Sequence, residues 1–339
     1  MKIFNSGITL RITALWAFSE AFLGGLLHGF KIPFAGLALS LVASLCMSLI
    51  AASGEKRGGI IRATLVVIAI KFILSPHTPP MAYAAVLIEG IAGELFFLQR
   101  RYMRTASFFL TLFCLMYSAF QHLLVLTIVF GKEFWTALDS FLNGITKTFV
   151  KQPQHYSLYL VLFYISCYFI AGVFGGILNS RIIKRIRYGT PPPLIDEVNK
   201  KYPDGLKDID FEEVRPQKRK KTNWQYIIGG ILLVIFILSY TPIFEKTVLK
   251  TKVIEIALRG TIIIFAWTFL LSPLLIRWVS KWVERYKSTQ GSVLQEVLSL
   301  LPDIKKIVQL SWQMAAGKNK LKRFTDFISN TMLLVVYGR

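Results

Sequence analysis

Apolar stretches of about 20 residues recur along this chain and constrain its fold more than any other feature. An α-helix rises 1.5 Å per residue, so a stretch of about 20 apolar residues crosses the roughly 30 Å of hydrocarbon in a lipid bilayer. The chain has 339 residues, of which 54% are hydrophobic. Its mean hydropathy of +0.51 is too high for a water-soluble domain of this length. The sequence therefore predicts an all-α, polytopic helical membrane protein.

The positions of the apolar stretches predict a six-plus-two arrangement of membrane spans. The eight predicted spans are 12–27, 33–52, 60–74, 80–98, 105–130, 156–178, 225–244 and 253–276. No small-residue cleavage motif follows the first span, so we expect it to stay in the chain. The predicted regions are a membrane module at 1–180, a basic and proline-rich linker at 181–222, a two-span segment at 223–280 and amphipathic helices at 281–339.

Lysine and arginine predict the orientation of these spans. With the N-terminus in the cytoplasm, 31 of the 40 basic residues fall in cytoplasmic segments and seven in outer segments, while Lys71 and Arg259 fall within spans. This bias predicts that both termini are cytoplasmic in a bacterial-type inner membrane. The net charge of +21 then reflects basic loops facing anionic lipid headgroups, and we expect no nucleic-acid partner.

Several ionisable residues lie within the predicted spans and form the candidate ligand site. By helical rise, Glu20, Glu89 and His122 lie about 11, 14 and 12 Å below the outer face. Gln121 adjoins the histidine, and Lys71 is shallower, able to bend toward a carboxylate or to snorkel outward. Two interpretations remain open: a structural network that fixes helix packing, or a polar pocket that holds a small solute or ion.

A second glutamate in the fourth span, Glu94, is not expected to join this cluster. It lies five residues beyond Glu89, about 140° around the helix. We expect it to make either a packing contact or a contact in the cytoplasmic half, with Arg62 or Arg100 as the candidate partners.

Small residues recur at helical spacing within the spans. Gly90 and Gly93 are three apart, and Gly172 and Gly176 are four apart. Small residues allow close helix approach, so internal packing and a contact face for a second membrane protein are both compatible with the pattern.

The stretches "LWAFSEAFLGGLLHGF" and "SPHTPPMAYAAVLIEGIAGELFF" carry a resemblance to a known family. Residues 1–180 resemble the substrate-binding component of energy-coupling factor (ECF) transporters. The resemblance implies that small residues of the first helix, Ala17, Ala21 and Gly25, contact a membrane coupling protein, and that a vitamin or metal ion binds near the outer side. The rest of the chain loosely resembles the coupling component, whose cytosolic helices dock on ATPases, although it has fewer spans and lacks the Ala-Arg-Gly signature in those helices.

The segment 288–326 is predicted to form two amphipathic helices, the second beginning near Pro302. The apolar positions Leu298 and Val308, with Trp312, must be covered by the membrane surface or by a groove on a partner such as a cytosolic ATPase. The outer segment 131–155 is also predicted to be an amphipathic helix.

The sequence leaves three functions open. They are a transport component, a non-transport membrane scaffold that recruits a partner, and an intramembrane enzyme with Glu89 and His122 as acid and base. No G-x-x-x-x-G-K-[ST], H-E-x-x-H or G-x-S-x-G motif occurs, so we predict no catalytic residues and no metal site, and no cofactor is indicated.

Overall fold

The structure, a computed structural model, describes residues 6–24, 34–75, 80–146, 154–188, 272–316 and 320–338. Every regular element within these ranges is a helix, which confirms the all-α class for this part of the chain. The chain forms two compact units. The first comprises residues 1–119, 167–211 and 275–339, and the second comprises residues 120–166 and 212–274.

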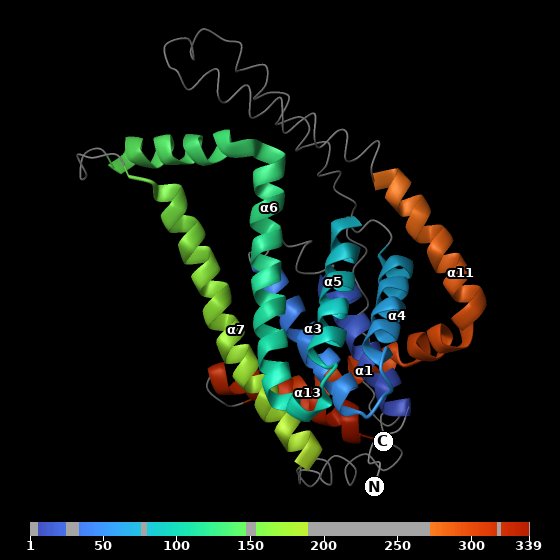
Figure 1. The fold of residues 1–339 in the computed structure, drawn as a ribbon. Coiled ribbons are helices and arrows are strands. Elements are labelled where there is room, and N and C mark those ends of the chain that lie inside the picture. Colours follow the sequence, from blue (N-terminus) through green and yellow to red (C-terminus); the bar gives the residue numbers. More distant parts are fainter. Residues whose placement is uncertain are drawn as a thin grey trace. The chain divides into compact units, whose positions relative to one another are not determined.

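The helices, in chain order, are α1 (Ser6–Phe18), the π-helical turn η1 (Ser19–Leu23), α3 (Ala35–Ala52), α4 (Gly59–Leu74), α5 (Pro80–Phe96), the 3-10 turn η2 (Arg100–Tyr102), α6 (Met103–Thr146), α7 (Tyr156–Tyr188), α11 (Ser272–Ser299), α12 (Leu301–Met314) and α13 (Lys320–Tyr337) (Figure 1).

Most of the described residues in the first six predicted spans are helical. Within the described residues, three segments are long and apolar enough to cross a membrane: Ala35–Ala52, Arg100–Thr146 and Tyr156–Ile186. Helices α4 and α5 have 16 and 17 residues, slightly below that length. The predicted span 225–244, most of 253–276 and most of the linker lie outside the described residues. Helix α7 continues to Tyr188, so the first residues assigned to the linker are helical.

Helices α1, α3, α4 and α5 of the first unit pack on one another around a fully buried core that includes Trp16, Leu45 and Ile70. Small residues make this packing close. A Cβ atom added to Gly90 of α5 would collide with the side chain of Thr64 on α4, and one added to Gly176 of α7 would collide with Phe108 of α6. These glycines therefore serve internal helix packing, one of the two roles that their spacing predicted.

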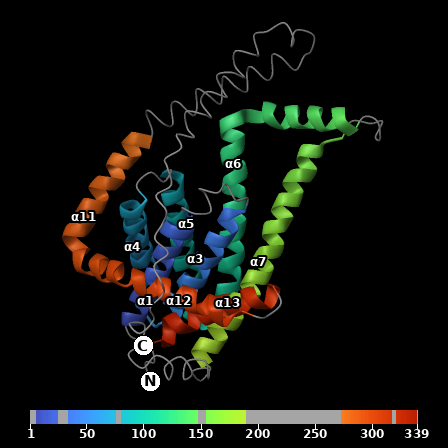
Figure 2. The same cartoon turned by 180° about the vertical axis from the view of Figure 1, so that it is seen from behind.

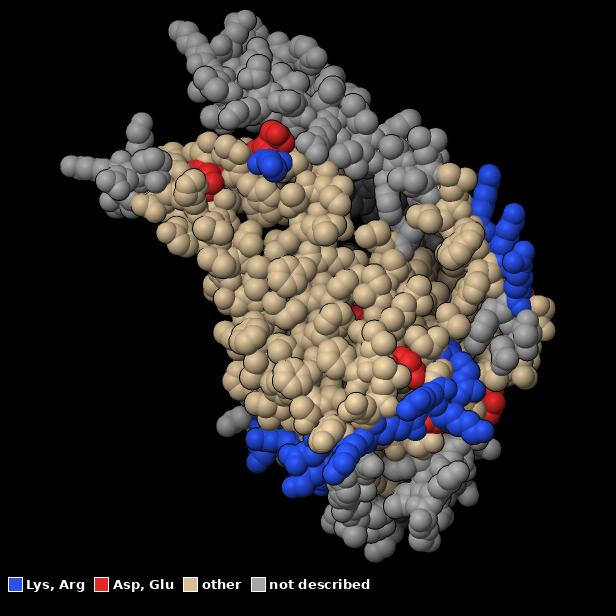
Figure 3. Space-filling view, in the orientation of Figure 1, with Lys and Arg blue, Asp and Glu red and all other residues tan. Residues whose placement is uncertain are grey.

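Exposed basic side chains gather at one end of the first unit, where α3, α5 and α7 end and α4 and α6 begin. Figure 3 shows them as a band below a surface with few charges. Exposed residues at this basic end include Lys56, Arg57, Arg62, Arg101, Arg104, Arg181, Lys184 and Arg185. Large apolar side chains such as Phe109 and Phe174 stay exposed farther along α6 and α7, at 49% and 69%. This layout matches a membrane helix bundle with an apolar belt and one strongly basic rim.

Helices α12 and α13 lie across the basic end and pack on each other and on α1 (Figures 1 and 2). Arg11 of α1 donates a hydrogen bond to the carbonyl of Gly338, just after α13. The Tyr337 hydroxyl donates to the carbonyl of Ile186 on α7 at 2.9 Å, and burial raises the pKa of this phenol above its usual value. The hairpin of α12 and α13 is thus bonded to α1 and to α7.

Much of the apolar surface of this hairpin is covered within the chain itself. Ile304 and Ile307 of α12 and residues 331–336 of α13 are buried. The sequence offered a membrane surface or a partner's groove as the cover, whereas the structure covers much of these faces by α1 and by the two helices themselves. The predicted helix start near Pro302 is confirmed.

In the second unit, α6 changes direction at Gly131, whose φ of 75° and ψ of −175° are not helical. A positive φ is accessible to glycine at little cost, so this residue permits the bend. The chain then continues as a helix to Thr146, which confirms that part of the helix predicted over 131–155. Its end is held by Asn143, whose side chain exchanges two hydrogen bonds of 2.8 Å with the backbone of Gln154.

The contact of Gly90 with Thr64 gives a direct test of the α4–α5 packing. We expect Gly90→Ala to lower the free energy of unfolding by about 1–3 kcal/mol, because the added methyl overpacks a buried contact. Gly291→Ala in α11 is the matched control, since nothing lies within 4 Å of its added Cβ. That control should gain up to about 1 kcal/mol from helix propensity. Thermal unfolding in detergent measures both, and equal melting temperatures for the two variants would refute this packing.

Candidate functional site

Glu20 is held in a π-helical turn. The regular α1 helix ends at Phe18, and Ser19–Leu23 continue it with the wider π spacing. Single π turns within helices are uncommon and occur frequently at functional sites. The turn contacts α3 and α4, and the Glu20 residue is only 4% exposed. The backbone irregularity therefore places a carboxylate inside the helix bundle.

Lys71 of α4 is the partner of this carboxylate. Its Nζ lies 2.7 Å from Oε2 of Glu20, and both side chains are almost fully buried, with 6% and 4% of their surface exposed. Of the two positions that the sequence allowed for Lys71, the structure has the inward one. A buried pair of this kind stabilises the fold only while both charges are present, because either charge alone would be left desolvated.

Glu89 of α5 lies near this pair and has a different partner. The Ser40 hydroxyl of α3 donates a hydrogen bond of 2.6 Å to Oε1 of Glu89, and the Glu89 residue is 5% exposed. Glu20 and Lys71 are close enough to act on it electrostatically. Three of the five predicted ligand-site residues are thus brought into one buried region, formed by η1, α3, α4 and α5.

Gln121 and His122, the other two predicted residues, belong to the second unit. The exposed His122 ring packs against Tyr164 of α7, with the ring centroids 6.0 Å apart and a 37° angle between planes. Gln121 is partly buried and also engaged in a contact. Their participation in a ligand site stays a prediction.

A serine-lined face of α3 is the feature that sequence reasoning missed. Ser40, Ser44 and Ser48 recur every fourth residue and therefore share one side of an otherwise apolar helix. Ser40 serves Glu89, while Ser48 and Thr111 of α6 each accept a hydrogen bond of 2.9 Å from the Asn179 amide on α7. The four-residue spacing of the serines was the available signal.

Glu94 is used in a way that its sequence position did not indicate. Its carboxylate accepts hydrogen bonds from the backbone N–H groups of Gly58, Ile60 and Ile61 at 2.6, 3.2 and 3.4 Å. It thus caps the start of α4, where helical N–H groups lack backbone partners. The predicted packing contact of Glu94 is present, but it is made with the backbone of α4, and Arg62 instead lies 3.9 Å from Glu55.

The predicted partner-facing residues are placed as follows. Ala17 and Ala21 are buried by the chain's own helices, and Gly25 lies outside the described residues. Leu298 and Val308 are half-buried. Trp312 is 47% exposed, with the Arg323 guanidinium 4.2 Å from its ring centroid. The role of these residues in binding a partner stays a prediction.

No group of three or more His, Cys, Asp or Glu side chains suited to a metal ion occurs in the described part of the chain. No family model, curated protein or solved structure matches the chain significantly.

A double-mutant cycle tests whether the Glu20–Lys71 pair supports the fold. We expect Glu20→Gln and Lys71→Gln each to lower the free energy of unfolding by about 3–5 kcal/mol, because each leaves one buried charge uncompensated. The double variant should lose much less than the sum, since no lone charge remains.

The exposed pair of Arg62 and Glu55 provides the matched control for this cycle. Its atoms are 3.9 Å apart and its side chains 65% and 26% exposed. The coupling energy from the same glutamine substitutions should stay below about 1 kcal/mol. Denaturant unfolding in detergent yields both coupling energies. A coupling for Glu20 and Lys71 no larger than the control's would mean that the buried pair does not hold the bundle together.

Proposed function

We propose that this chain is a component of a membrane transport system, and that its six N-terminal helices bind a small polar solute or ion. In this proposal the chain crosses a bacterial-type inner membrane eight times, with both termini in the cytoplasm. The basic end of the first unit then faces the cytoplasm. The resemblance of residues 1–180 to the substrate-binding component of energy-coupling factor (ECF) transporters is consistent with this arrangement.

The proposal rests on one observation, the buried carboxyl group of Glu89. Glu20 and Lys71 neutralise each other, so Glu89 is a second acidic group beside a single lysine. Ser40 supplies one hydrogen bond but no charge. A carboxylate in such a position favours a proton, a metal cation or the positively charged part of a solute. A buried acidic group of this kind is therefore suited to bind such a ligand.

Helix α1 offers a route from this region to the cytoplasmic partner. The η1 turn that follows α1 carries Glu20, while α1 itself contacts the hairpin of α12 and α13 and bonds Gly338 through Arg11. A positive charge that binds near Glu89 competes with Lys71 for the carboxylates of Glu20 and Glu89. This competition weakens the ion pair that joins the η1 turn to α4. The exposed side of the hairpin, including Trp312, is then available to a cytosolic ATPase or a membrane coupling protein.

A membrane scaffold is the second candidate function, and a different observation favours it. Glu20 pairs with Lys71, and Glu94 caps α4, so two of the three glutamates within the first six predicted spans have structural tasks. If Glu89 with Ser40 is a third such contact, the buried polar groups serve helix packing alone. In that case the exposed face of the hairpin would recruit a partner without transport.

Bound ligand in purified protein separates the two functions. The full chain is purified in mild detergent, and its small-molecule and elemental content is measured by mass spectrometry for the wild type and Glu89→Gln. We expect the wild type to retain a bound solute or cation. Glu89→Gln should retain at least roughly tenfold less of it per protein, because a charge-assisted contact is lost. The melting temperature should stay nearly unchanged.

Glu296→Gln, at an exposed position of α11, is the control and should retain the wild-type amount. A lower melting temperature for Glu89→Gln, with no bound ligand in any variant, would support the scaffold and refute the binding site.

A further inference from the structure

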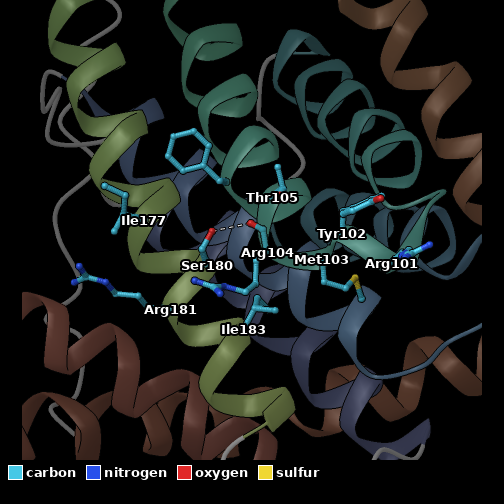
Figure 4. A pocket seen from close by; sticks show the side chains of 10 residues that line it. Arg101, Tyr102, Met103, Arg104, Thr105, Ile177, Ser180, Arg181 and Ile183 are labelled. Atoms are coloured by element: carbon cyan, nitrogen blue, oxygen red, sulfur yellow. Dashed lines mark hydrogen bonds between the residues drawn. The ribbon is translucent and has the colours of Figure 1, made fainter.

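A cavity of about 530 Å³ lies at the basic end of the first unit, between the start of α6 and the last turns of α7. Three arginines line it: Arg101 of η2, Arg104 of α6 and Arg181 of α7. Figure 4 shows Arg104 extending toward α7 and Arg101 at the opposite side, beside Tyr102. This cavity is separate from the buried region around Glu89, because none of the residues of that region lines it.

Within the described residues, no acidic group compensates the charge in this cavity. No aspartate or glutamate of this part of the chain lines it, and the ion pairs found there involve none of the three arginines. All three arginine residues are exposed. Arginine presents a planar fork of N–H donors that matches the oxygens of a phosphate group. The cavity is therefore complementary to a phosphate anion.

The walls of the cavity are apolar next to these charges. Phe108 of α6 and Ile177 and Ile183 of α7 also line it. Beyond it, Phe174 and Ile170 of α7 are 69% and 55% exposed, and Phe109 of α6 is 49% exposed. Helices α6 and α7 are two of those long and apolar enough to cross a membrane. A ligand with a phosphate at one end and hydrocarbon at the other would satisfy both parts of this surface.

We propose that this cavity is a binding site for the headgroup of an anionic phospholipid. The phosphate binds between Arg104 and Arg181, and the acyl chains run along the exposed apolar faces of α6 and α7. Basic pockets between membrane helices bind anionic headgroups by this combination of charge and apolar contact. The Ser180 hydroxyl, which donates a hydrogen bond of 2.7 Å to the Arg104 carbonyl, fixes the two helices at the centre of the cavity.

Native mass spectrometry of the full chain in detergent tests this site. The protein is titrated with phosphatidylglycerol, with phosphatidylcholine and with inorganic phosphate. We expect the wild type to retain phosphatidylglycerol in preference to phosphatidylcholine, and Arg104→Gln/Arg181→Gln to bind phosphatidylglycerol roughly tenfold more weakly or worse. Lys56→Gln/Arg57→Gln removes the same charge from the basic end outside the cavity and should bind as the wild type does.

A third variant separates the cavity from the general charge of this surface. Thr105 is an exposed residue of the cavity wall. Thr105→Trp fills the space without changing charge and should also reduce phosphatidylglycerol binding. Normal binding by Thr105→Trp, or equal losses in the two double variants, would overturn the site. Displacement of phosphatidylglycerol by millimolar inorganic phosphate would overturn the lipid assignment, leaving a free phosphate as the ligand.

Discussion

The buried ion pair between Glu20 and Lys71 is the interaction on which the N-terminal helices depend. It joins the irregular turn after α1 to α4 in a region where water is excluded. Charges in such a place are costly unless they are paired, and a buried pair offsets that cost only when its geometry is good. The pair therefore fixes the rotation of two helices at once. Neighbouring apolar contacts alone would leave that rotation less strictly defined, because apolar packing is non-directional.

The helical class and the positions of the first six helices could be predicted because apolar length and periodicity are local properties of a sequence. The partner of Glu94 could not be predicted in the same way. A carboxylate that caps a helix accepts hydrogen bonds from backbone N–H groups, which every residue except proline carries. No side-chain pattern therefore indicates which N–H groups will donate to it. Arginine partners are expected for Glu94 from the sequence because arginine side chains carry the opposite charge and can be identified there.

The packing of the C-terminal amphipathic helices shows a second limit of prediction from sequence. Their apolar spacing predicts that one face is buried but does not specify against what. The contacts with α1 connect residues more than 280 positions apart, such as Arg11 and Gly338. The candidate site was predicted in part for a related reason: Glu20, Lys71 and Glu89 are charged residues in apolar spans and therefore conspicuous. Ser40 is small, neutral and common in membrane helices, so only its four-residue repeat with Ser44 and Ser48 distinguishes it.

The packing of α12 and α13 on α1 has a consequence for how the protein is made. Helix α1 leaves the ribosome before the other described helices, whereas residues 301–338 emerge after the rest of them. During synthesis the face of α1 that the hairpin covers has no cover from this chain. A translation product that stops before residue 301 would keep that face open, and exposed apolar surface favours aggregation and degradation. The contact between α1 and the hairpin can therefore form only after synthesis has passed residue 338.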